Sequence, residues 1–169
     1  MEIIVIDQLC LNFKQVVDVD TKMLTHEWYA KGIFNDLELE FSFNEFLFKK
    51  LETDEIIIDW EVIRAILKNS ITNLDSLIKQ SENVLRSLYK EVFKSGEKDF
   101  DSKLIYFSLL GLNISLISKN KYFDDYQFDL IFLLESEIDH LRDTYFTYYS
   151  TFRNLGSTLV ITGVRREEA

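Results

Sequence analysis

The chain of 169 residues is acidic and rich in core-forming side chains: its formal net charge is −10, and 47% of its residues are hydrophobic. This composition excludes an intrinsically disordered chain and predicts a single domain over residues 1–169. The charge disfavours nucleic acid and anionic membranes as partners, because both repel an acidic surface, and it favours a basic protein.

The first part of the chain predicts strands. Residues 2–6 form a continuous apolar run, and apolar residues then alternate with polar ones from Leu9 to about residue 19. The segment Thr25 to Lys31 shows no clear period, so it is assigned to neither a helix nor a strand. From Leu37 to Phe43, leucine and phenylalanine alternate with glutamate and serine, which is typical of a strand with one buried face.

Cys10 is the only cysteine, so no internal disulfide is expected. Its apolar neighbours Leu9, Leu11 and Phe13 predict a buried structural thiol; the alternative, a nucleophile, is disfavoured because no basic residue adjoins it.

Two helices are predicted next, over about residues 59–69 and 73–94. Asp59 is a suitable N-cap for the first helix, and Ser95-Gly96 is a suitable end for the second. A stripe of residues spaced by three and four, mostly apolar, begins just before the second helix and runs along it: Ile71, Leu74, Ile78, Ser81, Leu85, Leu88 and Val92. We expect this stripe to lie on a sheet; the alternative is a coiled coil that binds a second chain.

The last third of the chain predicts four strands: Lys103–Ser118, Tyr126–Glu135, Thr144–Arg153 and Thr158–Arg165. Each is rich in β-branched or aromatic residues or alternates apolar with polar side chains, and Gly111 marks a β-bulge in the first. Strands, then helices, then strands again predict an α+β fold. We expect a mainly antiparallel sheet of about six to seven strands, with both helices on one face and Tyr, Thr and acidic residues on the other.

The sequence carries no motif for catalysis, metal binding or phosphate binding. Neither His26 nor His140 belongs to a zinc-binding pattern, and no GxSxG or glycine-rich phosphate loop is present. Asp139, His140 and Asp143 are close in sequence, but a hairpin loop explains them better than a metal site. We therefore expect no cofactor and no metal ion.

A binding face is predicted on the later strands. Hydrophobicity places Phe146 and Phe152 in the core, so the odd-numbered side chains of the strand Thr144–Arg153 face outward. Tyrosine and arginine are enriched at binding hot spots, and nearby acids suit a basic partner. The alternative is that these aromatics are core residues covered by the N-terminal strands. The predicted binding residues are Tyr145, Tyr149, Arg153, Asp129 and Glu135.

Three functions are consistent with these features. The first is a protein-interaction role; in being small, acidic and motif-free, the chain resembles bacterial immunity proteins, which bind and block a toxin, and this implies a basic toxin as partner. The second is a small-molecule enzyme or ligand-binding domain that uses carboxylates on an open sheet face, namely Glu38, Glu40, Asp129 and Glu135. The third is a homodimer built through the helices.

We expect a non-enzymatic protein, either a monomer or a homodimer. The start of the chain lacks the basic residues and long apolar run of a secretory signal, which predicts a cytoplasmic location. Frequent Lys, Asn, Ile and Phe are typical of an AT-rich bacterial or phage genome.

Overall fold

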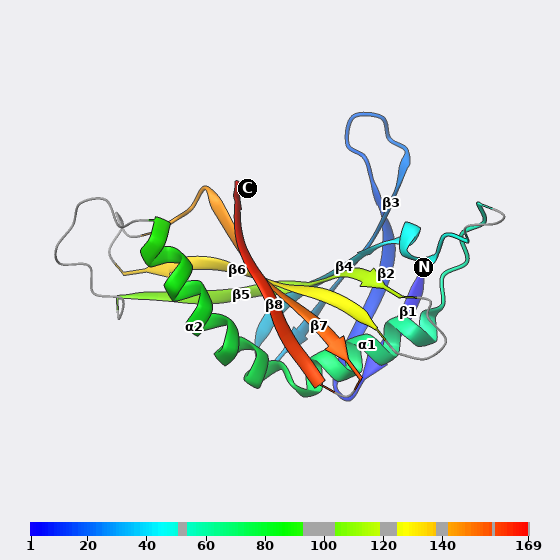
Figure 1. The fold of residues 1–169 in the computed structure, drawn as a ribbon. Coiled ribbons are helices and arrows are strands. Elements are labelled where there is room, and N and C mark those ends of the chain that lie inside the picture. Colours follow the sequence, from blue (N-terminus) through cyan, green and yellow to red (C-terminus); the bar gives the residue numbers. More distant parts are fainter. Residues whose placement is uncertain (51–53, 93–103, 119–124, 138–141, 157, 169) are drawn as a thin grey trace.

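The computed structural model describes residues 1–50, 54–92, 104–118, 125–137, 142–156 and 158–168. They form an eight-stranded sheet in which the strands follow one another in chain order, with two helices on one side (Figure 1). The α+β class and the placement of the helices are as the sequence predicts. The strands are β1 (Glu2–Ile6), β2 (Leu9–Val17), β3 (Leu24–Phe34), β4 (Leu37–Asn44), β5 (Ile105–Ile117), β6 (Tyr126–Ser136), β7 (Phe146–Leu155) and β8 (Thr158–Glu168).

The strand count differs from the prediction of six to seven because β3 has no strand-like period in its sequence. Its core-facing positions include Ala30 and Gly32, which are small, whereas the apolar Leu24 and Ile33 are 65% and 68% exposed. Side-chain hydrophobicity therefore does not alternate along β3. Backbone pairing defines this strand instead, since it runs antiparallel to β4 from Glu27 to Phe34.

Neighbouring strands are antiparallel except for β4 and β5, which run parallel. The helices α1 (Trp60–Thr72) and α2 (Leu74–Val92) connect these two strands, as a parallel pair requires a crossover. Asp59 caps α1, because its carboxylate accepts the backbone N–H groups of Glu61 and Val62, both at 3.2 Å. The part of the predicted second helix beyond Val92 lies outside the described residues.

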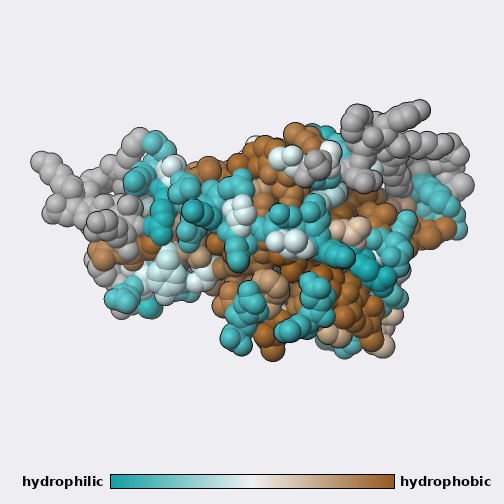
Figure 2. Space-filling model, turned by 90° about the horizontal axis from the view of Figure 1, so that it is seen from below, coloured by the Kyte–Doolittle hydropathy of each residue, from teal (hydrophilic) through white to brown (hydrophobic). Residues whose placement is uncertain are grey.

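The core lies between the helices and one face of the sheet. Phe128, Leu130 and Phe132 of β6 are fully buried, as are Leu67 of α1 and Leu85 of α2. Burial of each such side chain contributes about 1.5–3 kcal/mol, so this layer dominates the stability of the fold. Seen from the helix side, polar side chains lie along the outer surfaces of α1 and α2 (Figure 2).

Gly111 allows β4 and β5 to approach at the centre of the sheet. A Cβ atom at this position would lie 2.1 Å from the carbonyl oxygen of Glu40, which no side chain tolerates. The register between β5 and β6 shifts between Leu109 and Gly111, which confirms the predicted bulge. The bulge and the glycine together set Ser42 of β4 beside Asn113 of β5.

The prediction that Cys10 is buried is wrong. Side chains of β2 alternate, so Leu9, Leu11 and Phe13 point into the core, and Cys10 between them points to solvent. Apolar neighbours along a strand lie on the opposite face from the residue between them, and they do not indicate its burial.

Candidate functional site

A row of polar side chains crosses the face of the sheet that is turned away from the helices. Strand register places Tyr29, Ser42, Asn113, Asp129 and Thr151 side by side on β3 to β7. The Ser42 hydroxyl donates to Asn113 Oδ1 at 3.0 Å. We call this side of strands β3–β8 the open face, because α1 and α2 cover the other side (Figure 1).

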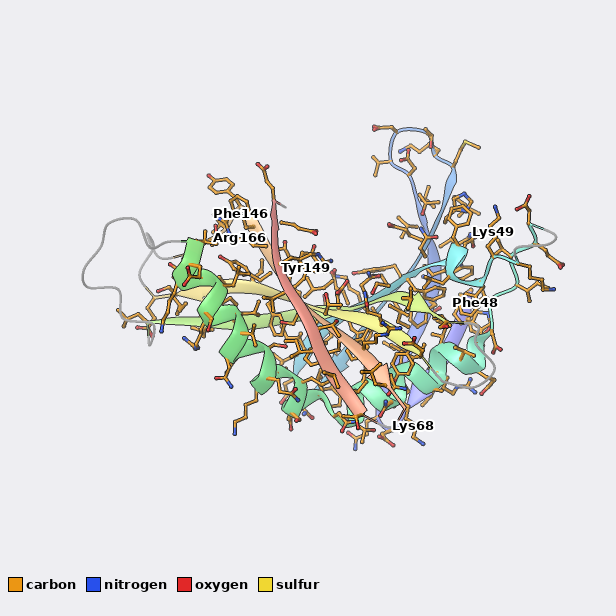
Figure 3. The ribbon with its side chains drawn as sticks, in the orientation of Figure 1. Phe48, Lys49, Lys68, Phe146, Tyr149 and Arg166 are labelled. Carbon is orange, nitrogen blue, oxygen red and sulfur yellow. The ribbon has the colours of Figure 1, made fainter. Side chains whose placement is uncertain are left out.

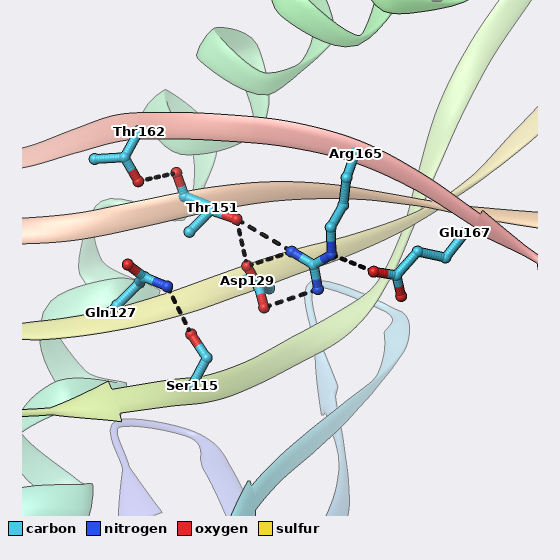
Figure 4. Close-up of polar contacts among 7 residues, drawn as sticks. All are labelled: Ser115, Gln127, Asp129, Thr151, Thr162, Arg165 and Glu167. Atoms are coloured by element: carbon cyan, nitrogen blue, oxygen red, sulfur yellow. Dashed lines mark hydrogen bonds and ion pairs between the residues drawn. The ribbon is translucent and has the colours of Figure 1, made fainter.

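Arg165 of β8 organises one end of this row (Figure 4). Its Nη1 and Nη2 donate to Asp129 Oδ1 and Oδ2 at 3.1 and 3.2 Å, and its Nε donates to Glu167 Oε1 at 2.6 Å. Thr151 links the two sides, since its hydroxyl donates to Asp129 Oδ1 at 2.6 Å and accepts from Arg165 Nη1 at 3.2 Å. The guanidinium also lies 4.2 Å from the ring centre of Tyr149, at cation–π distance.

The ion pair of this cluster joins a buried carboxylate to a partly exposed guanidinium. The side chain of Asp129 is 4% exposed and that of Arg165 is 40% exposed, so a buried carboxylate holds an arginine at the surface. The hydrogen bond to Asp129 raises the pKa of Arg165, and burial raises the pKa of Tyr149, with the charge of Glu167 adding to that rise. Both oxygens of Asp129 accept hydrogen bonds from Arg165, and Oδ1 also accepts from Thr151. The role of Asp129 is therefore to hold the guanidinium of Arg165 in place.

A hollow of about 450 Å³ lies beside this cluster on the open face. Its lining comes from strands β3 to β8 and from Leu47, which follows β4. In Figure 3 the label of Tyr149 lies over the middle of the sheet, and that of Lys68 lies at the lower edge of the molecule, on the helix side. Residues that line the hollow include Glu27, Ser42, Asn44, Leu47, Asn113, Ser115, Ile131, Tyr149, Arg165 and Glu167.

The five predicted binding residues do not form one patch. Asp129 and Tyr149 meet through Arg165. Arg153 lies on the same face of β7, but it binds Asp125, with its Nε 2.7 Å from Oδ1. The two remaining residues lie apart: Glu135 is half-buried near the far end of β6, and Tyr145 is 77% exposed just before β7 begins.

Sequence reasoning missed Arg165, Thr151 and Glu167, which complete the cluster. Arg165 lies within the predicted last strand, but the register of β7 and β8 shifts between Thr151 and Phe152, and this shift decides which residue of β7 Arg165 faces. The register places Arg165 opposite Tyr149 and Glu167 opposite Thr147. Extending the hairpin from its turn without this shift would have placed Arg165 opposite Tyr148, on the core face, so the sequence carries no signal for its place on the open face.

The carboxylates of the enzyme alternative do not converge. Glu38 and Glu40 both bind Lys31, at 3.0 and 2.9 Å, and this contact lowers the pKa of Glu40. Asp129 lies across the sheet and binds Arg165. Within the part of the chain that the structure describes, no group of three or more His, Cys, Asp or Glu side chains has the arrangement of a metal site.

A second arginine cluster closes the end of β7 and β8. Arg166 donates to both oxygens of the buried Asp143, at 2.7 and 3.1 Å, and its guanidinium lies 3.2 Å from the ring centre of Phe146 (Figure 3). The Tyr148 hydroxyl donates to Asp143 at 2.6 Å, and burial raises the pKa of Tyr148. These contacts give Asp143 a structural role, while its sequence neighbours Asp139 and His140 lie outside the described residues.

Comparisons with known proteins return no relative: no family model, no curated protein and no solved structure matches the chain. Among the described residues, no helix has the length and apolar character needed to cross a lipid bilayer.

Proposed function

We propose that this chain is a protein-binding protein whose open face holds a basic segment of its partner. The observation that carries the proposal is the hollow on this face, whose lining includes Glu27 of β3 and Glu167 of β8. The open face as a whole is acidic, because its carboxylates outnumber its cations. The carboxylates are Glu27, Glu38, Glu40, Asp129, Glu135 and Glu167, and the cations are Lys31, Arg153 and Arg165.

The lining of the hollow suits a long basic side chain. Leu47, Ile131 and the ring of Tyr149 offer apolar contact to the methylene stem of a lysine or arginine. The carboxylates of Glu27 and Glu167 outnumber Arg165, the one cation among the described residues of the lining, and attract the charged end of such a side chain. Ser42 and Asn113 supply hydrogen-bonding groups. Complementary charge of this kind accelerates association and selects partners by sign.

The more specific form of this proposal is an inhibitor of the immunity or antitoxin type, acting in the bacterial cytoplasm on a basic toxin. The net charge of −10 and the acidic open face support it, because a basic toxin would be attracted to this side of the sheet. In this role the protein needs no chemistry of its own, only a surface that covers the toxin.

A charge-reversal experiment tests the proposal. A fluorescein-labelled lysine-rich peptide is titrated with the wild type and with a Glu27→Lys, Glu167→Lys double variant, and fluorescence anisotropy reports binding. The control variant, Glu61→Lys with Glu82→Lys, makes the same change in net charge on the helix side, and it also removes one surface ion pair. We expect the open-face variant to bind at least about tenfold more weakly than the control variant.

Equal loss of affinity in the two variants would show that the peptide responds only to net charge, and it would refute a specific site on the open face. A further comparison uses sodium chloride, because screening weakens a charge-driven contact. We expect the affinity of the wild type to fall as the salt concentration rises.

A small-molecule ligand in the same hollow is the second candidate. Its volume of about 450 Å³ falls within the range of about 300–1,000 Å³ that is typical of ligand sites. This candidate predicts that a cationic small molecule found by thermal-shift screening competes with the lysine-rich peptide and perturbs the NMR signals of Ser42 and Asn113. A peptide complex that no such compound displaces would leave protein binding as the better account.

A further inference from the structure

The hairpin between β2 and β3 ends in a tip, Val17–Leu24, that exposes large apolar side chains. Val17, Val19, Met23 and Leu24 are 50%, 77%, 69% and 65% exposed. Val17 and Leu24 lie directly opposite each other across the two strands, so they share one side of the hairpin. Isolated exposed apolar residues are common on proteins, but a cluster at the end of a projecting hairpin is a feature of interaction sites.

The tip is held in one conformation by Asp18. Its Oδ1 accepts the backbone N–H groups of Thr21 and Asp20, at 2.7 and 3.1 Å, and the Thr21 hydroxyl at 2.8 Å. The backbone N–H of Asp18 donates to the carbonyl of Met23 at 2.9 Å, which closes the loop. A preformed tip loses little conformational entropy when it binds, so its exposed apolar area is available as binding free energy.

The tip projects on the same side of the sheet as the open face. Figure 1 shows the β2–β3 hairpin rising away from the sheet on the side opposite to α1 and α2. Strand β3 runs from the tip to the hollow, since Leu24 belongs to the tip and Glu27 lines the hollow. A protein seated on the open face would therefore lie next to the tip.

We propose that the hairpin tip inserts into an apolar groove, bordered by basic side chains, on the protein partner that the open face binds. The identity of that partner as a basic protein rests on the function proposed above. The basic border follows from charge complementarity, because the carboxylates of Asp18 and Asp20 outnumber the one cation of the tip, Lys22. The same carboxylates oppose a membrane, whose lipids are anionic, and they oppose the acidic hollow of a second copy.

A displayed peptide library tests the inference and does not require the natural partner. Random peptides on phage are selected against the full chain, and an enriched peptide is synthesised and titrated with two double variants. The tip variant is Val19→Ser with Met23→Ser. The control is Ile33→Ser with Leu37→Ser, in the β3–β4 hairpin, where the side chains are 68% and 52% exposed. Thermal melts verify that both variants remain folded.

We expect enriched peptides to combine large apolar residues with Lys or Arg. Their affinity should fall at least about tenfold in the tip variant and stay close to the wild-type value in the control. Equal affinity in the two variants would overturn the inference. Tip-dependent co-sedimentation with phosphatidylcholine and phosphatidylglycerol vesicles, or tip-dependent dimers in light scattering, would overturn it in favour of a membrane or of a second copy.

Failure of the inference and failure of the proposed function have different signatures. If the wild type does not bind the lysine-rich peptide, the open-face function fails whatever the tip does. If the wild type binds that peptide but the enriched peptides bind the tip variant as tightly as the wild type, the open-face function stands and the tip inference fails.

Discussion

Arg165 and Asp129 lie on β8 and β6, with β7 between them, and their side chains meet in a two-pronged ion pair above Thr151. The contact fastens the last strand to the middle of the sheet and fixes the guanidinium over the ring of Tyr149. Because Asp129 is buried and Arg165 is partly exposed, the two partners are not equivalent, and this asymmetry leads to the first prediction.

Replacement of Arg165 by alanine should destabilise the protein by about 2–3 kcal/mol, because it leaves the buried carboxylate of Asp129 without its charged partner. Arg64→Ala is the matched control: Arg64 binds Glu61 at the surface, at 2.7 Å, and exposed pairs of this kind contribute about 0–1 kcal/mol. Urea denaturation measures both variants. A similar loss of unfolding free energy in the two variants would mean that the buried carboxylate of Asp129 does not need Arg165 as its charged partner.

Replacement of Gly111 by alanine should destabilise the protein by about 3 kcal/mol or more, because the new methyl group would overlap the carbonyl of Glu40. Gly163→Ala provides the comparison, since nothing lies within 4 Å of a Cβ at that position. We expect that variant to stay within about 1 kcal/mol of the wild type. Thermal unfolding followed by circular dichroism distinguishes the two cases, and a tolerated Gly111→Ala would contradict the close approach of β4 and β5.

Acid should weaken a polar contact at Glu45. Its carboxylate lies 2.8 Å from His26 Nδ1 and accepts Trp28 Nε1 at 2.9 Å and Gln15 Nε2 at 3.1 Å. Burial acts to raise the pKa of Glu45, but these hydrogen bonds outweigh it and leave the pKa below its ordinary value. A group whose pKa is lowered by folding stabilises the protein above its unfolded pKa, and this stabilisation is lost as the pH falls through the folded value.

Glu45→Gln should therefore lower the free energy of unfolding by about 1–2 kcal/mol near neutral pH, and the difference from wild type should shrink as the pH falls below about 4. Urea denaturation across a pH series measures this difference. A difference that stays constant from neutral to acidic pH would mean that the charge of Glu45 contributes nothing.

Leu85→Ala should cost about 2–4 kcal/mol, because Leu85 is fully buried between α2 and the sheet and its truncation leaves a cavity. The adjacent Val84 is 36% exposed, so Val84→Ala should cost less than about 1 kcal/mol. Chemical denaturation of the two variants tests which side of α2 faces the core. The reverse order of stabilities would mean that Val84, and not Leu85, faces the core.

Side-chain alternation and helical spacing were sufficient to predict most of the fold, because both are local. The alternation along β4 and β6, the N-cap at Asp59 and the bulge at Gly111 each report a short-range physical constraint, and the structure agrees with all of them. Strand β3 escapes prediction because Ala30 and Gly32 occupy its inner face, and the burial predicted for Cys10 is wrong because neighbours along a strand lie on the other face.

The candidate site, in contrast, is a product of tertiary structure. Asp129, Thr151 and Arg165 come from three strands, and the sequence shows that each is polar but not that they touch. Strand order decides that β3 and β8 border one hollow, and the crossover through α1 and α2 decides which face stays open. These are long-range pairings, set by chain topology and by the fit of the two core surfaces, and local patterns carry no record of them.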